Sequence, residues 1–130
     1  MKYLLFIVFV LIFSSFVYAD YISEIMYDPE GSDNNLEYVE IVTSLDLSNY
    51  TISDLASSDI LTKMKASSNN IALIVEDSFD YSNIDANIYT VGANIGNNLN
   101  NEGDIISVKS DLIIIDYVHY FNSWGANSNG

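Results

Sequence analysis

The sequence predicts an all-β domain, a β-sandwich, that follows a short apolar N-terminal segment. From residue 20 onward the chain is rich in Ile, Val, Tyr and Thr, which favour strands. Its short apolar runs are separated by loops of Asn, Asp, Ser and Gly, the spacing typical of a sandwich. The chain contains no cysteine. The domain must therefore be stabilised by its hydrophobic core and not by disulfides.

The N-terminal segment has the pattern of an export signal. Lys2 is the one charged residue before an apolar run that extends to Phe13, and small or tolerated residues precede Asp20. This pattern predicts a signal helix over residues 1–19, cleaved after Ala19. The alternative is an uncleaved membrane anchor, although the run is shorter than the roughly 20 residues of a spanning helix. Both interpretations place the rest of the chain outside the cell or on its surface.

The expected strands follow one another at short intervals. Residues 37–43 show the clearest alternation, with Val39 and Ile41 on one face. Residues 54–68 leave open a strand or one helical turn. A hairpin is expected to turn at residues 110 and 111. The other predicted strands are residues 21–27, 50–53, 70–76, 88–91, 104–109 and 112–121.

The charge limits the classes of partner. Residues 20–130 carry 18 acidic residues and three lysines, a net charge of −15. Nucleic acid is disfavoured because its phosphates are bound through Lys and Arg. Anionic lipid is disfavoured for the same reason, so a membrane is expected only through an uncleaved segment 1–19. The charge permits cations, basic proteins or polymers of the cell envelope.

Several motifs occur in one order along the chain. They are ISEIMYDP at 22–29, EYVEI at 37–41, DLSNYTISD at 46–54, NEGDIISV at 101–108 and DYVHY at 116–120. In this order they resemble the lamin-tail domain family, in its prokaryotic secreted form. The resemblance implies an immunoglobulin-like β-sandwich over residues 20–130. It also implies a non-catalytic binding or structural module, not an enzyme, with an unidentified protein or envelope polymer as its partner.

The chain departs from the family pattern in two places that bear on the fold. Asn49 stands where the family usually has glycine, and the family continues with a final strand after the position of Gly130. The domain is therefore expected to lack its last strand. Two alternative functions remain open: a cation-dependent structural element of the envelope, or the targeting appendage of a larger secreted hydrolase.

Two site predictions concern loops. Asp28, Glu30 and Asp33 are hard oxygen ligands close together in sequence, so Ca²⁺ is the one cofactor the chain suggests. The alternative is an ordinary solvated turn, because the spacing differs from that of an EF-hand. Asn49 begins the sequon Asn49-Tyr50-Thr51, which predicts a glycosylation site in a turn.

For the other polar and aromatic residues singled out here, a structural role is weighed against a catalytic or binding role. Glu24, Glu37 and Glu40 could form a carboxylate pair for glycoside hydrolysis, but strand positions explain them without catalysis. His119 is the single histidine and has no second histidine with which to share a metal. Four aromatic residues near the end of the chain could pack in the core or form an exposed stacking platform: Tyr117, Tyr120, Phe121 and Trp124.

Overall fold

The computed structural model describes residues 19–31, 35–111 and 113–124. The predicted signal segment, except for Ala19, and Asp33 therefore lie outside the described residues. Within the described ranges the protein consists of strands in two sheets, followed by one short 3-10 helix, which confirms the all-β class. No helix in this part of the chain has the length and apolar character needed to cross a membrane.

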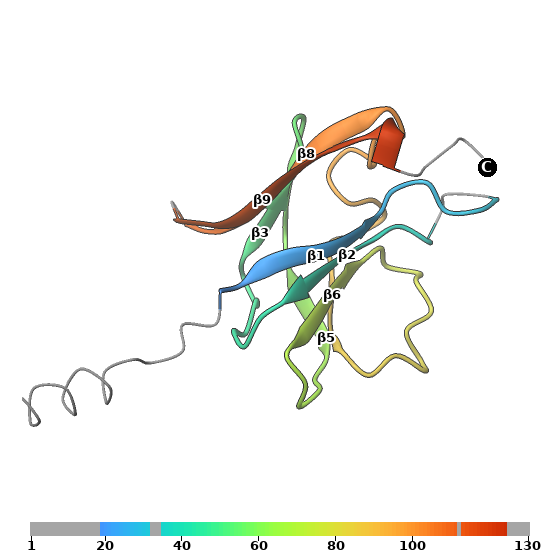
Figure 1. Ribbon diagram of the computed structural model, residues 1–130. Coiled ribbons are helices and arrows are strands. Elements are labelled where there is room, and N and C mark those ends of the chain that lie inside the picture. The colour runs from blue at the N-terminus through green and yellow to red at the C-terminus, as the bar shows by residue number, and fades with distance from the viewer. Residues whose placement is uncertain (1–18, 32–34, 112, 125–130) are drawn as a thin grey trace, which may run out of the picture.

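The strands form a five-stranded and a four-stranded sheet (Figure 1). In spatial order the first sheet contains β1 (Tyr21–Met26), β2 (Tyr38–Val42), β6 (Ile71–Val75), β7 (Asn87–Thr90) and β5 (Thr62–Lys65). The second contains β4 (Ser58–Ile60), β3 (Thr51–Ser53), β8 (Gly103–Ser110) and β9 (Ile113–Phe121). The helix η1 (Asn122–Trp124) follows β9 directly.

The predicted strands are present, and the open segment resolves into two more. Residues 54–68 contain β4 and β5, which belong to different sheets. The predicted hairpin is confirmed, since β8 and β9 pair antiparallel around Asp111, whose φ is 50°. Asp tolerates this left-handed conformation better than most residues.

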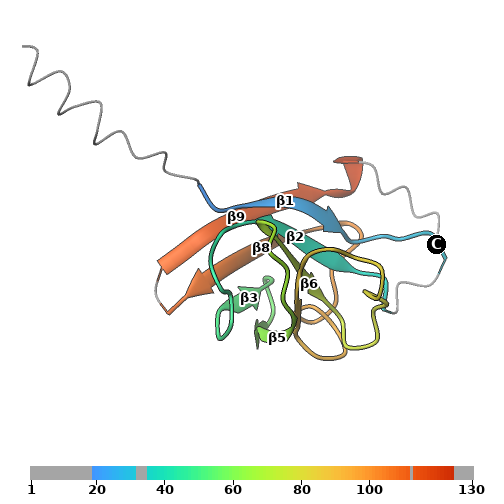
Figure 2. The same cartoon turned by 90° about the horizontal axis from the view of Figure 1, so that it is seen from below.

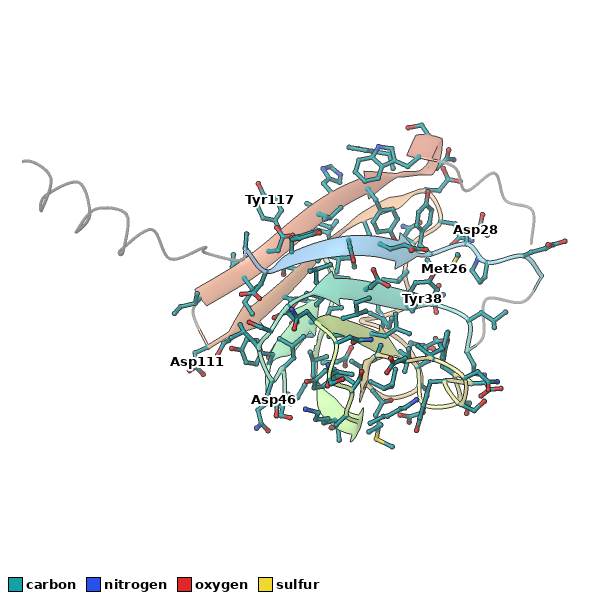
Figure 3. All side chains as sticks on the ribbon, turned by 60° about the horizontal axis from the view of Figure 1, so that its bottom comes forward. Met26, Asp28, Tyr38, Asp46, Asp111 and Tyr117 are labelled. Atoms are coloured by element: carbon teal, nitrogen blue, oxygen red, sulfur yellow. The ribbon has the colours of Figure 1, made fainter. Side chains whose placement is uncertain are left out.

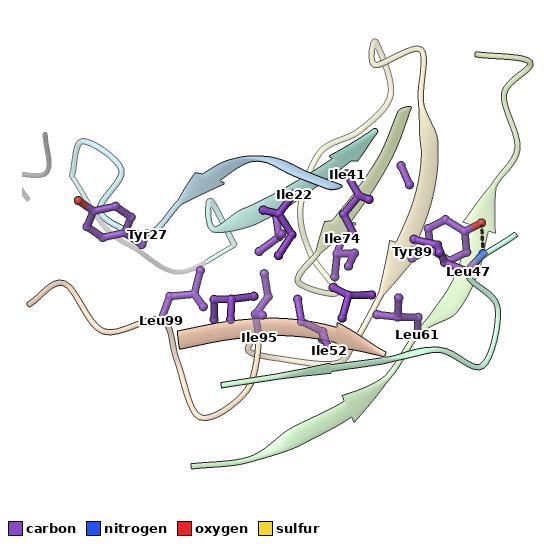
Figure 4. Packing of buried hydrophobic residues seen from close by; sticks show 14 of the residues in the cluster. Ile22, Tyr27, Ile41, Leu47, Ile52, Leu61, Ile74, Tyr89, Ile95 and Leu99 are labelled. Atoms are coloured by element: carbon purple, nitrogen blue, oxygen red, sulfur yellow. Dashed lines mark hydrogen bonds between the residues drawn. The ribbon is translucent and has the colours of Figure 1, made fainter. Parts of the chain in front are cut away.

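One hydrophobic cluster lies between the two sheets (Figure 4). Val39 and Ile41 both point into it, as the alternation of β2 predicts. From the opposite sheet Ile52 and Ile106 pack against them. The ring of Tyr89 is also buried, and its hydroxyl accepts a 3.0 Å hydrogen bond from the Leu47 N–H at the end of the cluster. This core fixes the two sheets against each other.

A second, smaller cluster covers the outer face of the five-stranded sheet. It forms because β6 and β7 pair in parallel, which requires the chain to cross from one end of the sheet to the other. The crossover contains no strand or helix, and Phe79, Tyr81 and Ile84 in it pack against Leu73 and Ile88. The outer face of the four-stranded sheet differs in that its end strand, β9, carries exposed large residues.

Candidate functional site

The two sheets approach each other along a seam between β1 and β9. β1 is the end strand of the five-stranded sheet and β9 is the end strand of the four-stranded sheet. Figures 1 and 2 both show the two strands side by side. Among the described residues no backbone–backbone hydrogen bond joins them. Each strand therefore has one edge that no neighbouring strand pairs.

Two side chains bridge this seam in place of a backbone ladder. Near the start of β1 the Ile22 N–H donates a 2.8 Å hydrogen bond to Oδ2 of Asp116 in β9. Just beyond the other end of β1 the Tyr27 hydroxyl donates to the Phe121 carbonyl at 3.2 Å. Side chains thus satisfy a few edge groups that a paired strand would otherwise satisfy.

Between these two bridges lies a slot of about 280 Å³. Its walls are mostly apolar, with Ile22 and Ile25 from β1 facing Val118 and Tyr120 from β9. Glu24 and Trp124 also line it. The slot is small for a drug-sized ligand, since such pockets typically measure about 300–1,000 Å³. Its size and walls suit one or two apolar side chains.

A row of exposed aromatic rings runs along the outer face of β9 and continues into η1, where Trp124 also lines the slot. Tyr117 is 64% exposed, Phe121 46% and Trp124 62%. Figure 3 shows Tyr117 projecting from β9 away from β1 and β2. The His119 and Phe121 rings are 4.1 Å apart and inclined by 40°, and Phe121 meets Trp124 edge-on at 6.3 Å and 66°. We call these four residues the aromatic row.

For the aromatic residues near the end of the chain, the sequence left open both core packing and an exposed platform. The structure places one of them in the core and three on the surface. Tyr120 is fully buried, stacks on Tyr27 at 4.3 Å, and donates a 3.0 Å hydrogen bond to the Asn100 carbonyl. Burial, followed by the nearby acidic groups, raises the pKa of its hydroxyl. Tyr117, Phe121 and Trp124 are exposed. The two-residue period of a strand explains why Tyr117 and Phe121 are exposed while Tyr120 is buried. Residues 117, 119 and 121 share one face of β9, and residue 120 lies on the other.

Many acidic side chains accept hydrogen bonds from loop backbone. Oδ1 of Asp54 accepts from the N–H groups of Ala56 and Ser57, at 2.7 and 2.5 Å, and Oδ2 accepts from Asn97 at 2.7 Å. Hydrogen bonds from Ser48 hold the pKa of the Asp46 carboxyl below its usual range. Part of the negative charge therefore organises turns.

Two of the three residues predicted to bind Ca²⁺ lie in the described part of the chain. Asp28 and Glu30 follow β1, where Glu30 is exposed and Oδ1 of Asp28 accepts a 3.3 Å hydrogen bond from the Asn101 amide. Asp33 lies outside the described residues. Within residues 19–31, 35–111 and 113–124 no group of three or more acidic or histidine side chains is placed to hold a metal ion. The Ca²⁺ interpretation remains a prediction.

Asn49, the predicted glycosylation residue, lies exposed in the turn before β3. Its φ is 67°, in the left-handed region. Asparagine adopts this conformation more readily than other non-glycine residues. This explains why an asparagine fits this turn position. Whether its amide carries a glycan remains a prediction.

Of the three glutamates considered for hydrolysis, Glu24 and Glu40 are brought together as opposite residues of β1 and β2, whereas Glu37 precedes β2 and lies in the interior. Glu37 is fully buried, and its Oε2 accepts a hydrogen bond from the Leu99 N–H at 3.3 Å. Glu24 instead accepts from the Tyr38 hydroxyl at 2.6 Å, and Glu40 from the Ser23 hydroxyl at 2.7 Å. The latter two carboxylates bind neighbouring side chains on β1 and β2, so their geometry is explained by sheet structure.

Comparison with family models, with curated proteins and with solved structures found no match to this chain.

Proposed function

We propose that this chain is a non-catalytic binding module of the cell exterior, an immunoglobulin-like sandwich of the lamin-tail type, that holds its partner at the aromatic row. Export is supported by the N-terminal sequence pattern, and the lamin-tail type by the order of its motifs. The partner is a protein or polymer of the cell envelope. The two sheets and their shared core are compatible with this fold.

The observation that carries the proposal is the exposure of Tyr117 and Phe121 on the edge strand β9 and of Trp124 in η1, which follows it. Scattered exposed apolar residues are normal on a protein surface, whereas adjoining ones mark interaction sites. Here the rings are adjoining, because Phe121 contacts both His119 and Trp124. Aromatic residues are also the side chains that most often dominate binding energy at interfaces.

The core does not require these rings. It already contains Tyr27, Tyr89 and Tyr120, each with its hydroxyl hydrogen-bonded to another part of the chain. Replacing Tyr117 or Trp124 should therefore alter binding while the sheets remain intact.

The test is retention on isolated cell envelopes of the source organism, measured by co-sedimentation. The double variant Tyr117→Ala/Trp124→Ala should be retained about tenfold less than the unchanged chain, a loss of about 1.4 kcal/mol in binding. The control is Leu55→Ala/Ile60→Ala, since these residues are 72% and 66% exposed but lie in or beside β4, the opposite end of the same sheet.

Circular dichroism should show both double variants folded. Equal retention of the two variants would refute the assignment of binding to the aromatic row. Failure of the unchanged chain to bind envelopes from its own cells would refute the envelope partner.

A further inference from the structure

The two sheets differ in what lies on their outer faces. The crossover between β6 and β7 packs on the five-stranded sheet, against Leu73 and Ile88. On the four-stranded sheet large side chains stay exposed from one edge strand to the other: Ile60 on β4 is 66% exposed, and Ile114 on β9 is 59% exposed. We call the outward side of β4, β3, β8 and β9 the open face. It includes Tyr117 and the rest of the aromatic row on β9.

The described strands of the open face direct no acidic side chain outward, although the chain contains 18 acidic residues. Each acid of these strands is paired across the sheet with a fully buried residue, so it projects to the inner side. The acids concerned are Asp59, Asp104 and Asp116. Lys109 and His119 project outward instead, opposite Ile114 and Ile105. The negative charge of this sheet is therefore directed away from the open face.

Hydroxyl groups cross the open face from β9 to β4. The register places Tyr117 opposite Ser107, Ser107 opposite Ser53, and Ser53 opposite Ser58. Neighbouring strands are about 4.8 Å apart, so this row is about 14 Å long. The Ser53 and Ser58 hydroxyls are hydrogen-bonded to each other at 2.7 Å. Within the described residues, the hydroxyls of Ser107 and of Thr51, which lies in the adjoining row, have no such partner. They can donate to and accept from a ligand.

The distribution of charge favours an uncharged ligand at this face. The net charge of −14 repels an anionic polymer at long range. A cationic polymer is attracted by carboxylates, which the open face does not present. An uncharged polysaccharide meets both conditions. Its hydroxyls can bond to the hydroxyl row, and the apolar side of a sugar ring can lie on the exposed rings of Tyr117 and Trp124.

From this charge distribution and these hydroxyls we propose that the open face binds an uncharged polysaccharide of the cell envelope. Sugar units stack on Tyr117 and Trp124, and the polymer continues across the sheet, where it exchanges hydrogen bonds with Ser107 and Thr51. A face four strands wide suits an extended polymer better than a small ligand. This inference rests on the proposed function and chooses between the two classes of partner named there, a protein and a polymer.

The first test asks which component of the envelope retains the chain. Isolated envelopes are digested with protease or oxidised with periodate, which cleaves the vicinal diols of sugars, and are washed before co-sedimentation with the purified full chain. Retention should survive the protease and fall about tenfold after periodate. Loss of retention after protease digestion would assign the partner to a protein, which overturns the inference and leaves the proposed function in place. Retention that survives both treatments would also overturn the inference.

The second test concerns the charge of the polymer. Polysaccharide released from the envelopes is separated by anion exchange into an uncharged and an anionic fraction, and each is cast into a native gel. The full chain should migrate more slowly in the gel that contains the uncharged fraction, and the anionic fraction should not slow it. Slower migration with the anionic fraction alone would refute an uncharged ligand.

The third test removes two hydroxyls from the open face, in the double variant Thr51→Val/Ser107→Ala. The matched control is Thr62→Val/Ser68→Ala, which makes the same two changes at exposed positions on β5 and in the loop after it. The first variant should lower the affinity for the uncharged fraction about fivefold, and the control should change it about twofold or less. Circular dichroism should show both variants folded. Equal effects of the two variants would overturn the inference.

The outcome is distinguishable from that of the proposed function. Loss of envelope retention in Tyr117→Ala/Trp124→Ala, together with equal effects of the two hydroxyl variants, would leave the aromatic row as the binding surface and refute the wider open face. A face without acids is also the one where two copies of the chain repel each other least. A dimer in sedimentation that Thr51→Val/Ser107→Ala weakens would assign the open face to a second copy and would refute the polysaccharide.

Discussion

Replacing Ile74 with alanine tests whether the core described here holds the two sheets together. Ile74 lies in β6, is fully buried, and contributes to the cluster shared by both sheets. The change removes three carbon atoms, worth about 2.4 kcal/mol at about 0.8 kcal/mol for each buried methylene. The residual cavity adds to this loss, because β6 is hydrogen-bonded to β2 on one side and β7 on the other and cannot move inward freely.

The expected loss in the free energy of unfolding is therefore about 3–4 kcal/mol, within the range of roughly 2–5 kcal/mol seen for such truncations. For a domain of this size the midpoint of thermal unfolding should fall by roughly 10–20 °C. The measurement is urea unfolding followed by far-ultraviolet circular dichroism, with the slope of the transition expected to stay unchanged. Trp124 fluorescence is a poor probe because that ring is already 62% exposed.

The matched control for this experiment is Ile60→Ala. Ile60 is 66% exposed on β4, an edge strand, so the same chemical change should cost about 0.5 kcal/mol or less. A loss below about 1 kcal/mol for Ile74→Ala, or equal losses for both variants, would mean that Ile74 does not face a dry core. The alternation assigned to the five-stranded sheet would then be wrong.

Two further predictions concern the backbone and the response to pH. Gly103→Ala should destabilise the protein by more than about 2 kcal/mol, because φ is +132° and an added Cβ would lie 2.8 Å from the Tyr120 carbonyl oxygen. The control is Gly92→Ala, at φ +113° with open space around the added Cβ, which should cost less stability in the same urea assay. Equal losses for the two variants would contradict the close approach at Gly103. Burial and, after it, the hydrogen bond to Glu24 raise the pKa of Tyr38 to about 12 from 10.0, so its contribution to stability is fully present below pH 10 and lost as the pH rises to about 12. Stability of the unchanged chain should therefore fall more steeply over that interval than stability of Tyr38→Phe, and parallel profiles would contradict the shift.

The sequence predicts those strands well whose residues alternate or are continuously apolar. β2 shows this, since Val39 and Ile41 are buried and Tyr38, Glu40 and Val42 are only partly buried. β4 could not be predicted in the same way, because Ser58 and Ile60 are exposed and the strand has no hydrophobic face. Periodicity also cannot identify partners, because it records which residues face a core and not which strand lies alongside. The hydrophobic pattern therefore could not predict that β6 and β7 pair in parallel.

The proposed binding surface could be predicted in part from the sequence. The aromatic residues near the end of the chain form a recognisable group, but composition alone does not separate Tyr120 from Tyr117. The period of two along β9 does separate them, as it places one in the core and the other on the surface. The seam could not be inferred in the same way, because it depends on β1 and β9, distant in sequence, becoming the edges of two different sheets.

The acidic composition acquires a structural meaning at this seam. An unpaired strand edge tends to join another edge, and natural proteins prevent this with charged residues, bulges or side chains that cap the edge. The seam has all three: Glu24 beside it, a bulge between Ile22 and Glu24, and the Asp116 bridge to β1. Because Glu24 and Asp116 are both acidic, they also oppose the approach of the same edge of a second copy of the chain.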